Sequence, residues 1–176
     1  MSSPLDIAMT TSGLASVLPR EGTQLVFLGG LPGSGKTYYA KHLEQQGWVF
    51  YDDFQCRAAG DSPRFRASRH YAELVSHLRS GQRCIVSDIR VIHDEYRRDA
   101  KAALRQDVGN VPTELHLFDN DPKQCAQNVR NADDGRRVEP RLDAIEFWSK
   151  HYSAPRDAVL HSVWRPPSGP DVLGPP

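Results

Sequence analysis

The sequence has no excess of either charge and few cysteines, and both absences limit what the protein can be. Lysine plus arginine and aspartate plus glutamate number 22 each in 176 residues, so the net charge favours no particular partner. The three cysteines are scattered without a C-x-x-C pair, which is typical of reduced thiols rather than disulfides or a zinc site. No apolar run approaches the length of a membrane span, and the N-terminus lacks the pattern of a signal peptide. These features predict a cytoplasmic, globular protein without a membrane partner.

The two ends of the chain are rich in small and turn-forming residues. We expect residues 1–22 to be a flexible leader and residues 165–176 to be a disordered tail rich in proline and glycine. Between them, residues 23–164 alternate short apolar runs with amphipathic segments, which predicts one domain. The predicted strands are 24–30, 48–53, 83–88, 113–119 and 158–164. This alternation predicts an α/β fold, with a parallel sheet of about five strands and helices on both faces.

Residues 30–37, GLPGSGKT, match the phosphate-binding pattern G-x-x-x-x-G-K-[ST]. Glycines let consecutive backbone N–H groups surround phosphate oxygens, and the following helix directs its positive end at them. Lys36 would reach the β- and γ-phosphates, and the Thr37 hydroxyl would bind Mg²⁺. A glycine-rich turn beside a lysine is the alternative, but the predicted strand before and helix after the motif favour a three-layer P-loop NTPase. The residues predicted to bind ATP, or else GTP, are Gly30, Pro32, Gly33, Ser34, Gly35, Lys36 and Thr37.

Two signatures of regulatory GTPases are missing from this sequence. N-K-x-D does not occur, and the only D-x-x-G is DVLG at residues 171–174, inside the proline-rich tail. The chain is also shorter than a large motor ATPase requires. A small phosphotransferase remains, in which catalysis consists mostly of positioning and electrostatics. Such an enzyme needs a carboxylate for the metal, a base for the acceptor hydroxyl, and cations around the transferred phosphoryl group.

Carboxylates end two of the predicted strands. Asp88 ends CIVSD, where a metal-supporting carboxylate would lie, although a strand-ending aspartate can also simply cap the next turn. Asp52 and Asp53 end WVFYDD, where a carboxylate can accept the proton of a substrate hydroxyl. Because neighbours on an extended chain point to opposite sides, we expect only one of this pair to face the cleft. A solvated acidic turn is the alternative for the pair.

Arginines gather in a polar gap between two predicted helices, within NVRNADDGRR at residues 128–137. We interpret this gap as a lid in which Arg130, Arg136 and Arg137 bind phosphate oxygens and exclude water. The alternative is a surface loop whose arginines pair with neighbouring carboxylates. A second basic stretch, residues 57–70, would either receive a phosphorylated or polynucleotide substrate or form a solvated helix face.

Taken in order, these motifs resemble the 5′-hydroxyl polynucleotide kinase family of P-loop kinases. The similarity covers about residues 24–152 and consists of PGSGKT, YDDF, VSD followed by EYRR, LFD, the arginine-rich gap and FWSKHY. The resemblance implies that Asp52 is the general base, that Asp88 is the aspartate of the third strand, and that Arg130 is the first lid arginine. It implies ATP and Mg²⁺ as cofactors and the 5′-hydroxyl end of RNA or DNA as the acceptor.

The sequence departs from this family at three positions on the acceptor side. Gln55 stands where the family has an arginine, so Arg57 would have to substitute, and Arg90 replaces an asparagine. Asp134 stands where the family has its second lid arginine, which leaves Arg136 or Arg137 to reach back. We therefore expect Asp53, Arg57 and Arg90 to contact the acceptor. The alternatives are a kinase of a small metabolite, nucleoside or nucleotide, and an ATP-binding switch or partner-binding module that transfers nothing.

Overall fold

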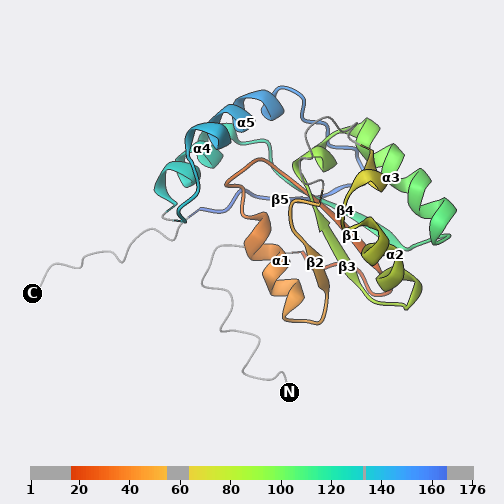
Figure 1. The fold of residues 1–176 in the computed structure, drawn as a ribbon. Helices are drawn as coiled ribbons and strands as arrows, with labels where there is room; N and C mark the ends of the chain where they lie inside the picture. Colours follow the sequence, from red (N-terminus) through yellow and green to blue (C-terminus); the bar gives the residue numbers. More distant parts are fainter. Residues whose placement is uncertain (1–16, 55–63, 133, 166–176) are drawn as a thin grey trace, which may run out of the picture.

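The computed structural model describes residues 17–54, 64–132 and 134–165, and these form a five-stranded, all-parallel sheet with helices on both faces (Figure 1). The strands are β1 (Leu25–Gly29), β2 (Val49–Tyr51), β3 (Cys84–Ser87), β4 (Thr113–Phe118) and β5 (Val159–His161). The helices are α1 (Lys36–Glu44), α2 (Tyr71–Arg79), α3 (Asp94–Asp107), α4 (Pro122–Asn131) and α5 (Glu139–Ser149), with short 3₁₀ helices η3 (Phe65–Ala67) and η4 (Ile89–Ile92). Within the described residues, no helix has the length and apolar character needed to cross a bilayer.

The α/β, three-layer architecture predicted from the sequence is confirmed. Each strand is shorter than its apolar run, and the largest difference is at the last strand, which ends at His161 rather than residue 164. Helix α2 begins at Tyr71, because Phe65–Ala67 form a separate 3₁₀ turn and Ser68 is extended. The predicted leader up to residue 16 and the predicted tail from residue 166 lie outside the described residues.

Strand β1 lies at the centre of the sheet, in the order β2-β3-β1-β4-β5, and it is buried on both faces. Its side chains alternate between two apolar layers, as the pleat of a strand requires. Val26 and Leu28 pack in the layer beneath α1, whereas Leu25 and Phe27 pack in the layer formed with the other four helices. A strand covered on both sides in this way reads as the continuous apolar run LVFLG.

All five strands run in the same direction, so their carboxyl ends meet at one edge of the sheet. The register places Leu28 of β1 beside Ser87 of β3, and Tyr51 of β2 beside Val86 of β3. The segments that follow these three strands therefore emerge next to one another. They carry the phosphate loop, the Asp52–Asp53 pair and Asp88, which is the arrangement that positions the candidate site.

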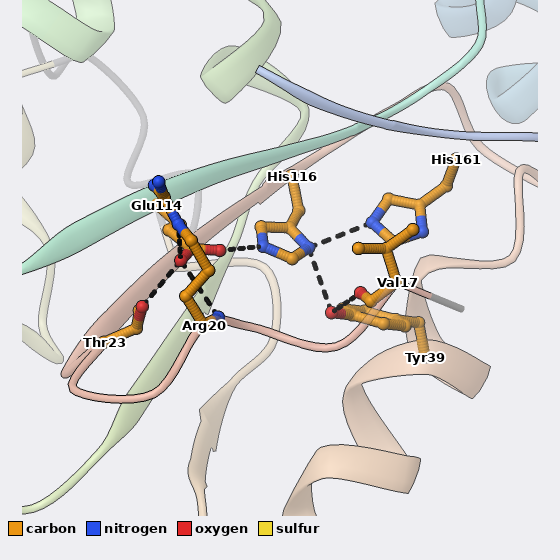
Figure 2. A network of polar contacts seen from close by, with 7 residues as sticks. All are labelled: Val17, Arg20, Thr23, Tyr39, Glu114, His116 and His161. Atoms are coloured by element: carbon orange, nitrogen blue, oxygen red, sulfur yellow. Dashed lines mark hydrogen bonds and ion pairs between the residues drawn. The ribbon is translucent and has the colours of Figure 1, made fainter. Parts of the chain in front are cut away.

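A buried polar network connects α1, β4, β5 and the segment before β1 (Figure 2). His116 Nε2 lies 2.9 Å from Glu114 Oε2, and His116 Nδ1 lies 2.9 Å from both His161 Nε2 and the Tyr39 hydroxyl. Glu114 Oε1 also accepts hydrogen bonds from Arg20 and from the Thr23 hydroxyl. The network thus attaches residues 17–23, at the end of the predicted leader and the start of the predicted domain, to the sheet.

One assignment of protons follows from the acceptors of this network, and it leaves no proton between the Tyr39 oxygen and His116 Nδ1, which lie 2.9 Å apart. Because the Val17 carbonyl oxygen can only accept, the Tyr39 hydroxyl donates to it over 3.0 Å. A charged Glu114 accepts the Nε2 proton of His116, and His116 Nδ1 then accepts from His161 Nε2. His161 Nδ1, which has no partner among the described residues, is left as an unprotonated nitrogen. Burial lowers the pKa of His116 and lowers that of His161 to about 4, so both imidazoles are neutral at pH 7.

Candidate active site

The phosphate loop joins β1 to α1, and two of its glycines are required by backbone conformation and by space. Gly33 has φ +78°, and a Cβ atom there would lie 2.6 Å from the Cys125 carbonyl oxygen on α4. Gly35 has φ +108°, and its Cβ would lie 2.8 Å from the Cβ of Trp164. Both positions combine a left-handed backbone with a close neighbour, so no other residue fits them without a shift of the surroundings.

Lys36, the first residue of α1, folds back over the loop. Its Nζ atom lies 2.8 Å from the Gly30 carbonyl oxygen and 2.9 Å from that of Leu31. Burial lowers the pKa of Lys36 to about 8, and nearby anionic groups, including Asp52 and Asp88, oppose this effect. The closest partners of the ammonium group are neutral oxygens, so its charge remains available to an anionic ligand. This is the position from which a lysine can reach phosphates bound in the loop.

Helix α4 and the segment after β5 support the outer side of the loop. The Asn128 Nδ2 atom donates to the Gly33 carbonyl oxygen over 2.8 Å and to that of Trp164 over 2.7 Å. The Trp164 backbone N–H in turn donates to the Ser34 carbonyl oxygen over 2.9 Å. These bonds satisfy the carbonyl oxygens of Gly33 and Ser34 from outside the loop and so support its conformation. Neither Asn128 nor Trp164 was among the site residues predicted from the sequence.

A cleft of about 1110 Å³ opens above the loop at the carboxyl edge of the sheet. It is lined by the loop and α1, by the residues after β2 and β3, and by α4, α5 and the segment between them. The predicted site residues among its lining are Pro32, Gly33, Gly35, Lys36, Thr37, Asp52, Asp53, Asp88, Arg90, Arg136 and Arg137. The fold therefore brings most of the predicted site together in one place.

Asp88 caps the start of η4 and also lines the cleft. Its carboxylate accepts a 2.8 Å hydrogen bond from the Arg90 backbone N–H at the start of η4, and it lies 3.4 Å from the Arg90 guanidinium. The residue is buried, with 2% of its surface exposed, yet it lines the same cleft as Thr37. The two functions that the sequence left as alternatives are thus compatible.

The donor set in this cleft fits a magnesium ion bound together with phosphates. Within the described residues, no group of three histidine, cysteine, aspartate or glutamate side chains is arranged to hold a metal alone. A hydroxyl from Thr37 and a carboxylate from Asp88 would instead supply two oxygen ligands, with the remainder coming from phosphate oxygens and water. Mg²⁺ commonly binds in this way, through few protein ligands.

Asp52 and Asp53 both line the cleft, which differs from the alternation expected of an extended chain. Strand β2 ends at Tyr51, and Asp53 then adopts φ +46°, the left-handed region. The Asp52 carboxylate accepts the Asp53 backbone N–H over 3.1 Å, which closes this turn. A left-handed turn lets successive side chains point to the same side, as an extended strand cannot. Aspartate is among the few residue types besides glycine that tolerate it.

The arginines of the predicted lid occupy different places. Arg136 and Arg137 line the cleft, whereas Arg130 is exposed on α4 and is not among the lining residues. Arg136 pairs with Asp134 through its side chain at 2.6 and 2.9 Å and through its backbone N–H at 3.1 Å. Arg141 of α5, which the sequence analysis missed, lies 3.3 Å from the same carboxylate and also lines the cleft. Asp134 thus holds two cleft arginines. Arg57 lies outside the described residues.

No protein-family model matches this chain. It is 29% identical over 133 residues to the uncharacterized protein R277 of Acanthamoeba polyphaga mimivirus, a match that spans 73% of this chain and 86% of the viral protein. Among solved structures, it resembles a gluconokinase from Sinorhizobium meliloti with a TM-score of 0.57 and 16% identity, over 84% of this chain and 86% of that one. It also resembles the protein APE1195 with a TM-score of 0.53 and 18% identity, over 82% of this chain and 86% of that one. The chain therefore shares the three-layer α/β fold of these two proteins.

Proposed function

We propose that the protein is an ATP-dependent kinase that transfers the γ-phosphate to a hydroxyl group, with the 5′-hydroxyl end of a polynucleotide as the preferred acceptor. The observation that carries this proposal is the convergence of Lys36, Asp52 and Asp88 on one cleft, where both carboxylates affect the pKa of the lysine. A phosphate-binding lysine, a candidate base and a candidate metal-supporting carboxylate are the minimal set for phosphoryl transfer.

The loop glycines and Lys36 hold the β- and γ-phosphates in this scheme. Asp52, on the solvent-exposed side of the cleft, accepts the proton of the acceptor hydroxyl as its oxygen attacks the γ-phosphorus. The bond from the γ-phosphorus to the bridging oxygen breaks, and ADP leaves. Arg136, Arg137 and Arg141 line the cleft, from which their positive charge stabilises the transferred group. Mg²⁺, held by Thr37 and Asp88 together with the phosphates, would neutralise further negative charge.

The choice of a polynucleotide end rests on the resemblance of the motifs and on the cations at the acceptor side. Arg90 lies two residues after Asp88, with its guanidinium 3.4 Å from that carboxylate, and it lines the same cleft as Asp52 and Asp53. A guanidinium at that position suits an acceptor that carries a phosphate beyond its reacting hydroxyl. The 5′ end of a nucleic acid has this chemistry. Arg90 therefore supports a polynucleotide more than an uncharged sugar.

Incubation with γ-labelled ATP and a panel of acceptors tests the proposal. The panel contains 5′-hydroxyl RNA, 5′-hydroxyl DNA, nucleosides and small polyols. Label in an oligonucleotide supports the proposed acceptor, and label in a small molecule replaces it with a metabolite kinase. ATP binding without transfer to any acceptor would indicate a nucleotide-dependent switch instead.

Substitutions in the cleft test the roles of individual residues. Lys36→Ala should abolish transfer, and turnover at the wild-type rate would contradict the scheme. Asp52→Asn should reduce turnover at least a hundredfold, on the order expected for loss of a general base, while the affinity for ATP stays nearly constant. A larger loss of turnover in Asp53→Asn would show that the base is the second carboxylate of the pair.

A further inference from the structure

Two aromatic rings form a stacked pair beside the phosphate loop. The rings of Tyr38 and Trp164 have centroids 5.5 Å apart and planes inclined by 22°. Both residues line the cleft, and Tyr38 is exposed over 61% of its surface. None of the steps of phosphoryl transfer described above uses either ring. A large aromatic surface at the mouth of a polar cleft is a feature of ligand-binding sites.

Both residues of the pair are connected directly to the phosphate loop. Tyr38 follows Thr37 directly, in the first turn of α1. The Trp164 backbone is fixed by its bonds to Ser34 and Asn128, and its Cβ occupies the space that the missing side chain of Gly35 leaves. The backbone positions that carry the two rings are therefore fixed relative to the phosphate loop. An aromatic surface at a fixed distance from a phosphate site is suited to the other end of the same ligand.

We propose that Tyr38 and Trp164 form the stacking surface for the base of the bound nucleoside triphosphate. This proposal rests on the proposed function, because it presumes that the loop holds a nucleotide. The phosphate loop holds the phosphates, and the flat base packs against the aromatic pair. Trp148, the other tryptophan of the cleft, lies on α5 against His93 and Phe147. Among the described residues it has no hydrogen bond to the loop, so it does not share this geometry.

Stacking of the base on this pair would affect which nucleoside triphosphates the protein prefers. Every base has a π-face, so an aromatic surface binds bases without reading the hydrogen-bonding groups on their edges. We therefore expect ATP and GTP to bind with dissociation constants within about tenfold of each other, and the smaller pyrimidine bases of CTP and UTP to bind more weakly because they overlap the rings less.

Binding measurements with and without the base test the proposal. Dissociation constants for ATP and for inorganic tripolyphosphate would be compared in the wild type, Tyr38→Ala, Tyr38→Phe and Trp164→Leu. Loss of the ring should weaken ATP binding by roughly 5- to 100-fold and leave tripolyphosphate binding unchanged. Tyr38→Phe, which keeps a ring, should retain the affinity for ATP. Equal losses for ATP and tripolyphosphate would overturn the proposal, because they would show that the residues only support the loop.

Tryptophan fluorescence provides a readout that does not depend on how well Trp164→Leu folds. In a Trp148→Phe background, the remaining tryptophans are Trp164 and Trp48, of which Trp48 is buried with 4% exposed. ATP and GTP should quench the emission, whereas tripolyphosphate at saturation should not. ATP binding without a change in emission would overturn the stacking proposal alone. Failure of both ATP and tripolyphosphate to bind would overturn it together with the proposed function.

Discussion

The Asn128 side-chain amide donates a 2.8 Å hydrogen bond to the Gly33 carbonyl oxygen, which ties helix α4 directly to the phosphate loop. The two residues are 95 positions apart in the sequence. Close approach of helix and loop is possible because Gly33 has no Cβ, which would otherwise lie 2.6 Å from the Cys125 carbonyl oxygen. The loop's conformation is therefore set by α4 as well as by the glycines of its own motif.

Asn128→Ala should destabilise the protein and weaken ATP binding together. The substitution leaves the Gly33 and Trp164 carbonyl oxygens without their shared donor, which costs about 1–3 kcal/mol of unfolding free energy. Urea denaturation and ATP titration measure the two effects. Gln127→Ala is the matched control, since it removes an exposed amide from the neighbouring position of the same helix. If both variants bind ATP as the wild type does, the loop does not depend on α4.

The left-handed turn at Asp53 predicts an unusual order of stabilities. Asp53→Gly and Asp53→Val both remove the carboxylate, but only glycine adopts φ +46° without strain. The free energy of unfolding of Asp53→Val should therefore be about 1–2 kcal/mol lower than that of Asp53→Gly, because a β-branched residue is strained in this region. The same pair of substitutions at Asp52 serves as the control, since both remove its carboxylate and Asp53 is the only residue other than glycine with positive φ in the described part of the chain. Equal stability of the Val and Gly variants at position 53 would show that the turn is extended in solution.

Under the proposed function, Asp134 would compete with the phosphates of the nucleotide for the cleft arginines. Its carboxylate holds Arg136 and Arg141, and its pKa is lowered to about 2, chiefly by the hydrogen bonds from Arg136. Asp134→Asn removes this negative charge and releases the guanidinium groups to phosphate oxygens. We expect ATP to bind about two- to fivefold more tightly, an effect as small as exposed ion pairs usually give.

Two controls distinguish competition for the arginines from an effect of the protein's net charge: a series of ionic strengths and a substitution of a nearby carboxylate. The gain in affinity of Asp134→Asn should shrink as ionic strength rises, because exposed charges are screened. Glu139→Gln removes one negative charge from an exposed position at the start of α5 and should leave ATP affinity nearly unchanged. An equal gain in both variants would mean that only the net charge of the protein matters.

The buried histidines predict a loss of stability in mild acid. The pKa of His161 in the folded protein, about 4, lies below the value of 6.5 for an unperturbed histidine. The unfolded chain therefore takes up a proton first as the pH falls, and the stabilising contribution is complete above pH 6.5 and declines down to about pH 4. The shift corresponds to at most about 3 kcal/mol. Glu114, whose pKa is lowered to about 2, acts in the same direction but only below its ordinary value of 4.5.

Chemical denaturation between pH 7.5 and 4.5 measures this effect. The free energy of unfolding of the wild type should fall across the range, and His161→Gln, which cannot titrate, should show a shallower decline. His151→Gln is the control, because His151 is exposed just after the end of α5. A decline in His161→Gln as steep as in the wild type would locate the titration elsewhere.

Sequence patterns predicted the sheet and most of the cleft for one physical reason. Each strand is a short apolar run that ends in a turn-forming or charged residue, and parallel strands present these ends at the same edge. The positions of Lys36, Asp52 and Asp88 at one edge of the sheet therefore follow from the sequence, because they are set by the topology.

The residues that the sequence did not reveal depend on contacts between distant segments. Asn128 reads as one more polar residue of an amphipathic helix, and only the packing of α4 on the loop shows its two acceptors. Trp164 is the last residue of the predicted fifth strand. In the structure the strand stops at His161, and the Trp164 backbone N–H donates to the Ser34 carbonyl oxygen. The left-handed conformation of Asp53 likewise has no signal beyond the tolerance of aspartate for it.

The contacts of Trp164 limit how far the C-terminal end of the protein can be shortened. A fragment that stops at the end of α5 would keep the whole glycine-rich motif, both candidate carboxylates and every cleft arginine. It would lack β5, the donor to the Ser34 carbonyl oxygen and one acceptor of Asn128. A C-terminal boundary chosen from the motifs alone would therefore remove these contacts. Recombinant versions of the protein should include residues 17–165.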